Sequence, residues 1–283
     1  MQVAIIGANG QLGSELTKFF PDCIALTHQD LDIENKAAVE EFFKNNKIDI
    51  IINTAAYHDM NKTETDPLKA FSVNSLAVKH LADECLKHHA TLIHISTDYV
   101  FDGKKNEPYT EEDTPNPLNW YGLSKAVGER IIRNHLPNHY IIRSSGVFGH
   151  TGCRAKGGGN FVETMIKKLA AGTDFTVVTD QTVSPTYAYD AAVAIKQLLE
   201  KKVPYGTYHL TNSGSCSWHE FASAIAQQTN SSTKILPGTS TASPIKRPDY
   251  SVLNNQKIKN HGIPMPTWQE ALSHYLSNRP SPK

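Results

Sequence analysis

Short runs of apolar residues rich in Ile and Val alternate with longer helical patterns along the first half of the chain, and this alternation constrains the fold more than any other feature. Apolar runs of this kind are typical of strands buried on both faces of a sheet. They lie at residues 3–6, 24–26, 48–52, 92–95 and 140–143, and the helical patterns between them cover 11–20, 36–46, 67–89 and 118–133. Strands that alternate with helices predict an α/β fold with a doubly wound, Rossmann-like parallel sheet.

The pattern changes after residue 143. Residues 146–159 are rich in glycine with polar residues between, which predicts a mobile loop rather than a sheet element, and one that a ligand can order. Further patterns follow: helices at 161–171, 189–200 and 218–228, and strands at 175–178 and 207–210. We expect a dinucleotide-binding core at 1–145, completed by 176–203, and a smaller, interleaved C-terminal substrate lobe formed by 146–175 and 204–283.

Composition narrows the class of partner. The 283 residues contain 28 Lys and Arg and 28 Asp and Glu, so the formal net charge is zero. Binding to nucleic acid or to a membrane surface is therefore not expected. The apolar stretch at the start ends at Gly7 and lacks a basic leader, which predicts a cytoplasmic location.

Cysteine and histidine spacing gives no sign of a disulfide framework or a metal site. Cys23, Cys85, Cys153 and Cys216 are scattered without a CxxC pair. Adjacent histidines such as His88 and His89 lack a third ligand at suitable spacing, so we predict no metal.

A glycine-rich turn follows the first strand directly and opens into a helix. Gly7 permits a tight turn, Gly10 lets backbone amides approach a pyrophosphate, and Gly13 permits close helix packing. Glycines that serve only a turn are the alternative, but the position at the first strand-to-helix junction favours a dinucleotide site, with Gln11 and Leu12 also lining it. The spacing G-x-x-G-x-x-G resembles that of the short-chain dehydrogenase/reductase superfamily.

The end of the second strand bears on cofactor choice. It carries Thr27 and His28 where an NAD-preferring site usually has an acid for the ribose 2′-hydroxyl. The residues favour NADPH, and Asp30 nearby leaves NADH open. The superfamily resemblance implies that Asp32 and Ile33 line the adenine.

Tyr121 and Lys125 lie four residues apart on an expected helix and therefore share one face. An ammonium group favours the phenolate and lowers the tyrosine pKa, which suits a general acid for a developing alkoxide. A half-buried tyrosine beside a solvated lysine is the alternative. Position favours catalysis, because Thr97 ends the preceding strand at the edge where open α/β sheets bind ligands.

Longer motifs resemble the dTDP-4-dehydrorhamnose reductase family of extended short-chain dehydrogenases over nearly the whole chain. They are STDYVFDG at 96–103, PLNWYGLSK at 117–125, NTAAY at 53–57, Val73-Asn74, Asp180-Gln181, SPT at 184–186 and Arg247-Pro248. The resemblance implies that Thr97, Tyr121 and Lys125 are catalytic. It implies further that Tyr121 and Lys125, with Ala55, Ala56 and Tyr57, contact a nicotinamide cofactor.

The same resemblance implies the reaction: reduction of the 4-keto group of a nucleotide-linked 6-deoxy sugar to give dTDP-L-rhamnose for surface polysaccharide. The expected substrate contacts are His58, Met60, Thr97, Asp98, Tyr99 and Arg247. A nucleotide sugar is the expected partner, and a homodimer is possible.

Some positions depart from the family pattern. Gly146 stands where the family usually has a tryptophan, and Asn61 replaces a usual aspartate. These departures leave the hydride chemistry intact and leave open which 4-keto sugar is reduced.

Two other functions stay open. A nucleotide-sugar dehydratase or epimerase often carries Thr-Asp-Glu, whereas this chain has Thr97-Asp98-Tyr99. A regulatory protein resembling the methionine adenosyltransferase β subunit would keep the fold and bind the cofactor without turnover.

Overall fold

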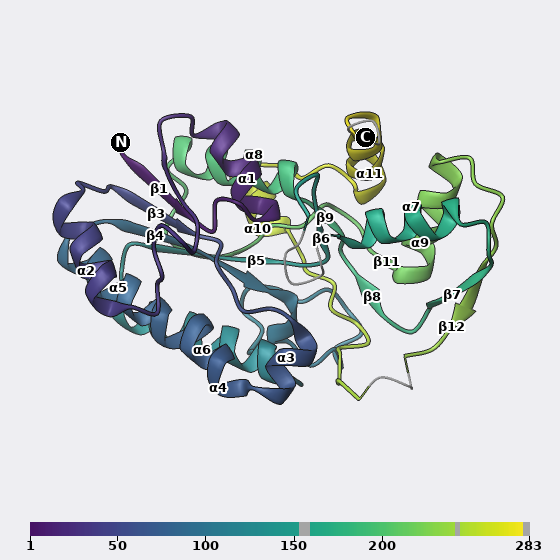
Figure 1. The fold of residues 1–283 in the computed structure, drawn as a ribbon, viewed down its shortest axis with the longest axis horizontal. Coiled ribbons are helices and arrows are strands. Elements are labelled where there is room, and N and C mark those ends of the chain that lie inside the picture. The colour runs from purple at the N-terminus through teal and green to yellow at the C-terminus, as the bar shows by residue number, and fades with distance from the viewer. Residues whose placement is uncertain (153–158, 241–243, 280–283) are drawn as a thin grey trace.

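The computed structural model describes residues 1–152, 159–240 and 244–279. Its centre is a six-stranded sheet with the order β10-β5-β4-β3-β1-β2, in which every neighbouring pair is parallel (Figure 1). The strands are β1 (Val3–Ile6), β2 (Ile24–Leu26), β3 (Ile50–Asn53), β4 (Thr91–Thr97), β5 (His139–Ser144) and β10 (Gly206–His209). The predicted Rossmann-like, doubly wound sheet is confirmed.

Helices cover both faces of this sheet because successive residues of each strand point to opposite sides. Val3 and Ile5 of β1 pack with α1 (Gln11–Phe19) and α8 (Ala188–Glu200) in one buried cluster. Ala4 and Ile6 pack with the other cluster, formed by α2 (Lys36–Asn45), α5 (Ala77–Lys87) and α6 (Trp120–His135). Figure 1 shows the two layers on opposite sides of the strands.

The predicted single helix over 67–89 is wrong in its middle. The structure has α4 (Pro67–Phe71), a π-helical turn η1 (Ser72–Leu76) and then α5. Asn74 of this turn is fully buried and binds the backbone of Tyr57, so a tertiary contact accompanies the wider turn. Such π turns are frequent at functional sites.

A smaller lobe lies beside the sheet (Figure 1). It contains three two-stranded pairs and three helices around their own apolar cluster. The strands are β6 (Val147–Phe148), β7 (Phe175–Val178), β8 (Thr182–Val183), β9 (Thr186–Tyr187), β11 (Cys216–Ser217) and β12 (Ile235–Gly238), and the helices are α7 (Phe161–Ala170), α9 (Trp218–Gln228) and α11 (Trp268–Ser277).

The prediction of a loop without sheet elements over 146–159 is therefore wrong in part, because β6 lies in this range and pairs with β9. Residues 153–158 of that loop lie outside the described part of the chain. Two elements also differ from the expected division. β10 belongs to the six-stranded sheet although 204–283 was expected in the lobe, whereas β7 pairs with β12 away from that sheet. The division into core and substrate lobe otherwise stays a prediction.

Three further short elements lie in the described ranges. They are α3 (Met60–Thr65), the 3-10 turn η2 (Asp98–Val100) and α10 (Gln256–Asn260). In the described ranges, no helix is long and apolar enough to cross a membrane.

Candidate active site

The turn between β1 and α1 has room only for glycine at two of its three glycine positions. Gly7 has a φ of 78°, and a Cβ there would lie 2.6 Å from Thr54 Oγ1. A Cβ on Gly13 would lie 2.2 Å from the Gly7 carbonyl oxygen. The turn is thus pressed against the end of β3 on one side and against its own helix on the other.

The N-terminus of α1 has no side-chain cap. Its N-cap is Gly10, which has no side chain to cap the first-turn amides, and the helix dipole favours an anion there. Next to it, Gln11 donates from Nε2 to the Val147 carbonyl at 3.4 Å, while its Oε1 is buried with no hydrogen-bond partner among the described residues. These features fit the pyrophosphate of a dinucleotide.

A carboxylate lies at the end of β2, although the positions that directly follow the strand, Thr27 and His28, are not acidic. Asp30 accepts hydrogen bonds at one carboxylate oxygen from the Thr27 hydroxyl at 2.6 Å and the Thr27 amide at 2.8 Å. These bonds lower the pKa of Asp30. His28 is exposed, and its Nδ1 lies 3.8 Å from a carboxylate oxygen of Asp32.

Two predicted cofactor contacts are core residues. Leu12 and Ile33 are 7 % and 4 % exposed and belong to the two apolar clusters on opposite faces of the sheet. Their contacts with the cofactor stay predictions.

The segment after β3 is fixed through its backbone. The Tyr57 N–H donates to Asn74 Oδ1, and Asn74 Nδ2 donates to the Tyr57 carbonyl, both at 2.9 Å. Asn74 Nδ2 also donates to Ser124 Oγ of α6 at 3.0 Å. The half-buried residues Ala55, Ala56, Tyr57, His58 and Met60 therefore lie on a segment tied to α6, the helix that carries Tyr121 and Lys125.

At the end of β4, a buried carboxylate gathers three hydroxyl groups. Asp98 accepts from Thr97 Oγ1 at 3.0 Å, Ser145 Oγ at 2.8 Å and Ser251 Oγ at 2.6 Å. Burial raises the pKa of Asp98, and the hydroxyl bonds oppose that rise. Asp98 is 4 % exposed and accepts from Thr97, and its contact with substrate stays a prediction.

Tyr121 lies in the first turn of α6 and is half-buried. Asn119 caps this helix by accepting from the Gly122 N–H at 2.8 Å, and its Nδ2 donates to the Lys246 carbonyl at 2.9 Å. The rings of Tyr121 and Tyr99 meet edge to face with centroids 6.1 Å apart. The cap therefore joins the start of α6 to the segment that carries Arg247.

Tyr99 and Arg247 are close enough to interact. Burial, with the nearby Asp98 carboxylate, raises the pKa of Tyr99 to about 12, and Arg247 opposes that rise. The structure thus places three predicted residues, Tyr99, Tyr121 and Arg247, around the end of β4.

Lys125 lies deeper than the phenol one turn earlier. It is 1 % exposed, and its Nζ donates to the Ile95 carbonyl at 2.6 Å and lies 3.0 Å from His94 Nε2. Burial lowers the pKa of Lys125 to about 7, despite the opposing attraction of Glu129. Burial also lowers the pKa of His94, and Lys125 adds to that effect.

Sequence reasoning missed His94 as part of this site, and it treated Asn53 only as part of a motif. Asn53 Nδ2 lies 3.2 Å from His94 Nδ1, so the two residues and Lys125 form a row of polar groups inside the sheet. The available signal was a histidine within the apolar run at 92–95, three residues before Thr97.

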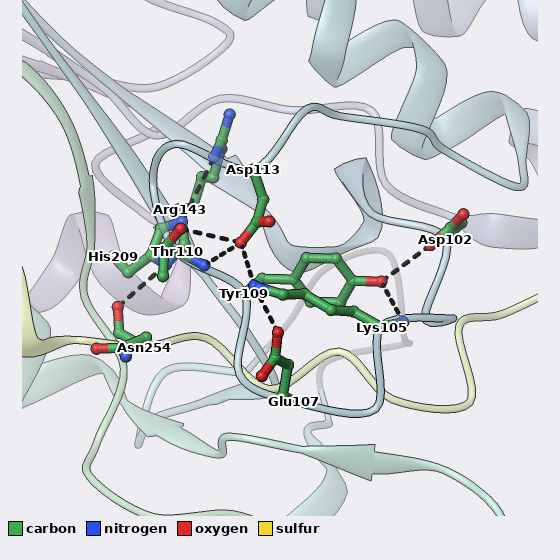
Figure 2. A network of polar contacts seen from close by, with 9 residues as sticks. All are labelled: Asp102, Lys105, Glu107, Tyr109, Thr110, Asp113, Arg143, His209 and Asn254. Atoms are coloured by element: carbon green, nitrogen blue, oxygen red, sulfur yellow. Dashed lines mark hydrogen bonds and ion pairs between the residues drawn. The ribbon is translucent and has the colours of Figure 1, made fainter.

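The loop from η2 to α6 is held by a polar network (Figure 2). The Tyr109 hydroxyl donates to Asp102 at 2.9 Å, and Lys105 Nζ donates to Asp113 at 2.8 Å. The Asn254 N–H donates to the Tyr109 carbonyl at 2.7 Å. This network attaches the loop before Tyr121 to the C-terminal segment.

The space beside Gly146 is occupied by a tryptophan from the lobe. Gly146 has a φ of 52°, and a Cβ there would lie 3.3 Å from Trp218 Cη2. A large side chain at 146 would displace this indole, which gives a structural reason for glycine at this position.

Among the residues that the structure describes, no three His, Cys, Asp or Glu side chains gather into a metal-binding group.

Comparisons with known proteins agree with this geometry. The family model described as RmlD substrate binding domain matches residues 1–280. The chain is 40 % identical over 286 residues to the spore coat polysaccharide biosynthesis protein SpsK of Bacillus subtilis, covering 99 % of this chain and 98 % of the relative. It is 38 % identical to a dTDP-4-dehydrorhamnose reductase of Aggregatibacter actinomycetemcomitans, covering 96 % of this chain and 97 % of the relative.

A solved structure has the same fold throughout. The dTDP-4-dehydrorhamnose reductase of Bacillus anthracis, determined in complex with NADP, is 35 % identical, covers 98 % of each chain and superposes with a TM-score of 0.92. These matches cover nearly the whole length of the chain, and the glycine turn and the buried Lys125 are consistent with them. The chain therefore belongs to the RmlD family, that of the dTDP-4-dehydrorhamnose reductases.

Proposed function

We propose that this protein reduces the 4-keto group of a nucleotide-linked 6-deoxy sugar, converting dTDP-4-dehydro-L-rhamnose to dTDP-L-rhamnose. The observation that carries the proposal is the arrangement at the end of β4. There Thr97 ends the strand, and Tyr121 and Lys125 come from α6. The N-cap of this helix also binds the segment that carries Arg247. Open α/β sheets bind ligands at this edge.

NADPH is the proposed cofactor, with NADH left open, and it supplies the hydride when bound. Gly7, Gly10, Gln11 and Gly13 would hold its pyrophosphate at the start of α1, and the NADP complex of the Bacillus anthracis relative supports this choice. Asp30 disfavours NADPH relative to NADH, because its carboxylate lies at the end of β2, where the ribose 2′-phosphate would bind.

Tyr121 is the proposed proton donor to the substrate oxygen as that oxygen gains charge. Lys125 below it would lower the pKa of the phenol when charged. Thr97 donates its hydroxyl hydrogen to Asp98 in this structure, so the hydroxyl must turn from Asp98 to hydrogen-bond the substrate carbonyl. Asp98 would then retain its bonds from Ser145 and Ser251.

The wider setting is also proposed. The lobe around Arg247 would bind the sugar nucleotide, with Arg247 on the diphosphate because a guanidinium matches phosphate oxygens. We place the protein in the cytoplasm and in surface polysaccharide synthesis, and the SpsK relative supports the latter. A homodimer remains a proposal.

The test is steady-state NADPH oxidation with dTDP-4-dehydro-L-rhamnose, followed by identification of the product. We expect continuous turnover and dTDP-L-rhamnose. A cofactor-dependent complex with another protein, without oxidation of NADPH by any 4-keto sugar nucleotide, would support the regulatory function instead. Conversion of a sugar nucleotide without net NADPH consumption would support an epimerase or dehydratase.

A further inference from the structure

Three buried side chains form a row that leads from the backbone at the predicted cofactor site to the catalytic lysine. Asn53 and His94 are fully buried, and Lys125 is 1 % exposed. Asn53 ends β3, His94 lies on the adjacent β4, and Lys125 reaches them from α6. Buried polar groups need partners within the protein, so the hydrogen-bond directions in this row are constrained.

The first link fixes the direction of the Asn53 amide. The Ala55 N–H donates to Asn53 Oδ1 at 3.1 Å. Because the oxygen faces Ala55, the NH₂ group faces His94 Nδ1 at 3.2 Å and donates to it. A neutral imidazole carries one proton, so His94 has its proton on Nε2.

The last link then concerns the charge of Lys125. The Nε2–H of His94 points at Lys125 Nζ, 3.0 Å away, and Nζ donates to the Ile95 carbonyl. A neutral amine has a lone pair that accepts from His94, but an ammonium group has only donors. The row of bonds is complete only when Lys125 is uncharged.

A proton added to Lys125 would create one donor-to-donor contact somewhere in the row. If the His94 proton moves to Nδ1, it meets the Asn53 NH₂ group. If the Asn53 amide then turns, its NH₂ group meets the Ala55 N–H. The conflict moves along the row and is not removed.

We propose that His94, oriented by Asn53, is a positioning residue that holds Lys125 as a neutral amine in the cofactor-free protein. Proton uptake by Lys125 is thereby linked to the direction of the Asn53 amide and to the Ala55 backbone. The proposal rests on the proposed function only in calling Lys125 catalytic.

The other charged groups near Lys125 do not provide this effect. Glu129, one turn later on α6, would favour the ammonium form, but its carboxylate oxygens are bound by Arg143 at 2.9 and 2.7 Å, by Arg133 at 3.1 Å and by Ser96 at 2.6 Å. Tyr121, one turn earlier, is the remaining titratable group on this face of α6. From β4, Nζ is contacted by the Ile95 carbonyl, which does not titrate, and by the His94 ring.

Two variants reverse or remove the hydrogen bonds that link Asn53, His94 and Lys125. Asn53→Asp keeps the shape and the acceptor for Ala55, but it places a carboxylate oxygen at His94 Nδ1, so that Nε2 becomes an acceptor for an ammonium group. His94→Gln adds no charge and offers Lys125 a carbonyl oxygen. The control is His209→Gln, which alters another fully buried histidine of the same sheet that contacts Arg143 instead of Lys125.

The experiment is an NMR pH titration of the Lys125 side chain in cofactor-free protein labelled with ¹³C-lysine, assigned with Lys125→Arg. We expect the acid dissociation constant of Lys125 to fall at least tenfold, one pKa unit, in both Asn53→Asp and His94→Gln and to stay unchanged in His209→Gln. A purely structural role for His94 would lower the melting temperature without moving the titration.

Midpoints in Asn53→Asp and His94→Gln equal to that of the wild type would overturn the proposal, as would a wild-type Lys125 that titrates at its ordinary pKa of 10.5. The titration uses no substrate, so its failure is distinct from a failure of the proposed reduction.

Discussion

At the scale of single residues, the burial of Lys125 makes the folding stability depend on pH. Burial lowers its pKa from 10.5 to about 7, so the unfolded chain binds a proton between these pH values that the folded protein releases. Folding stability therefore rises with pH across this range, and the cost is fully present below about pH 7.

Lys125→Met removes this dependence. We expect the variant to be more stable than the wild type at pH 7, by on the order of a few kcal/mol less the lost hydrogen bonds, with an advantage that shrinks towards pH 10. Thermal unfolding of both proteins at several pH values measures it, with the exposed Lys47→Met as control. An advantage that grows with pH would contradict the sign.

Single residues also mark the limit of sequence reasoning. The spacing of Tyr121 and Lys125 predicted a pair on one face of a helix, and both residues lie on α6. Asn53 and His94 could not be connected in this way, since their contact depends on the pairing of β3 with β4.

At the scale of elements, the start of α6 is set by one side chain. Asn119 caps the helix directly before Tyr121 and also binds the Lys246 carbonyl. Its loss should shift the phenol as well as destabilise the helix.

We expect Asn119→Ala to cost about 1 kcal/mol of stability, as capping residues do, and also to lower kcat. Asn35→Ala is the matched control, because Asn35 caps α2 by accepting from the Ala38 N–H. Its contact with the predicted site residue Asp32 is made by its backbone N–H, which alanine keeps. Denaturant unfolding and steady-state assays of both variants give the comparison. Equal effects on kcat would show that the cap has no special role at the site.

Elements with a clear pattern were predicted well, and those determined by tertiary contacts were not. The strands β1, β3, β4 and β5 were apparent as apolar runs, but β6, β8, β9 and β11 have two residues each and no detectable period. The π turn at Ser72–Leu76 likewise has no local signal, because Asn74 is held by Tyr57 and Ser124.

At the scale of the whole molecule, a buried cluster joins the sheet to the C-terminal segment. Ser251 is fully buried, 153 residues from Asp98 along the chain, and donates to it at 2.6 Å. The Ser251 N–H also donates to the Thr182 carbonyl at 2.9 Å.

Ser251→Ala removes one of three hydroxyl donors from a buried carboxylate. We expect a loss of about 1–3 kcal/mol in unfolding free energy and a lower kcat. The cofactor Kd should change little, because Ser251 binds Asp98 and the Thr182 carbonyl, and neither residue is a predicted cofactor contact. The control is Ser273→Ala, an exposed serine of α11. A wild-type melting temperature and kcat for Ser251→Ala would show that this link is dispensable.

The order of the strands in the sheet could not be fully predicted from the sequence. β10 was predicted as a strand, but its place beside β5 depends on a chain that leaves the sheet after Ser144 and returns at Gly206. Strand propensity carries no information about such a return, so the boundary of the lobe was the least predictable feature.

The central claim is that Tyr121 donates the proton in a reduction of a 4-keto sugar nucleotide. Single-turnover oxidation of bound NADPH by dTDP-4-dehydro-L-rhamnose, compared between the wild type and Tyr121→Phe, tests it most directly. Phenylalanine keeps the ring and its packing, so the fold and the cofactor Kd should change little, the latter by less than about threefold. We predict that the variant is about 10²- to 10⁴-fold slower, the usual contribution of a general acid. Oxidation at the wild-type rate would contradict the assignment of Tyr121 as the acid.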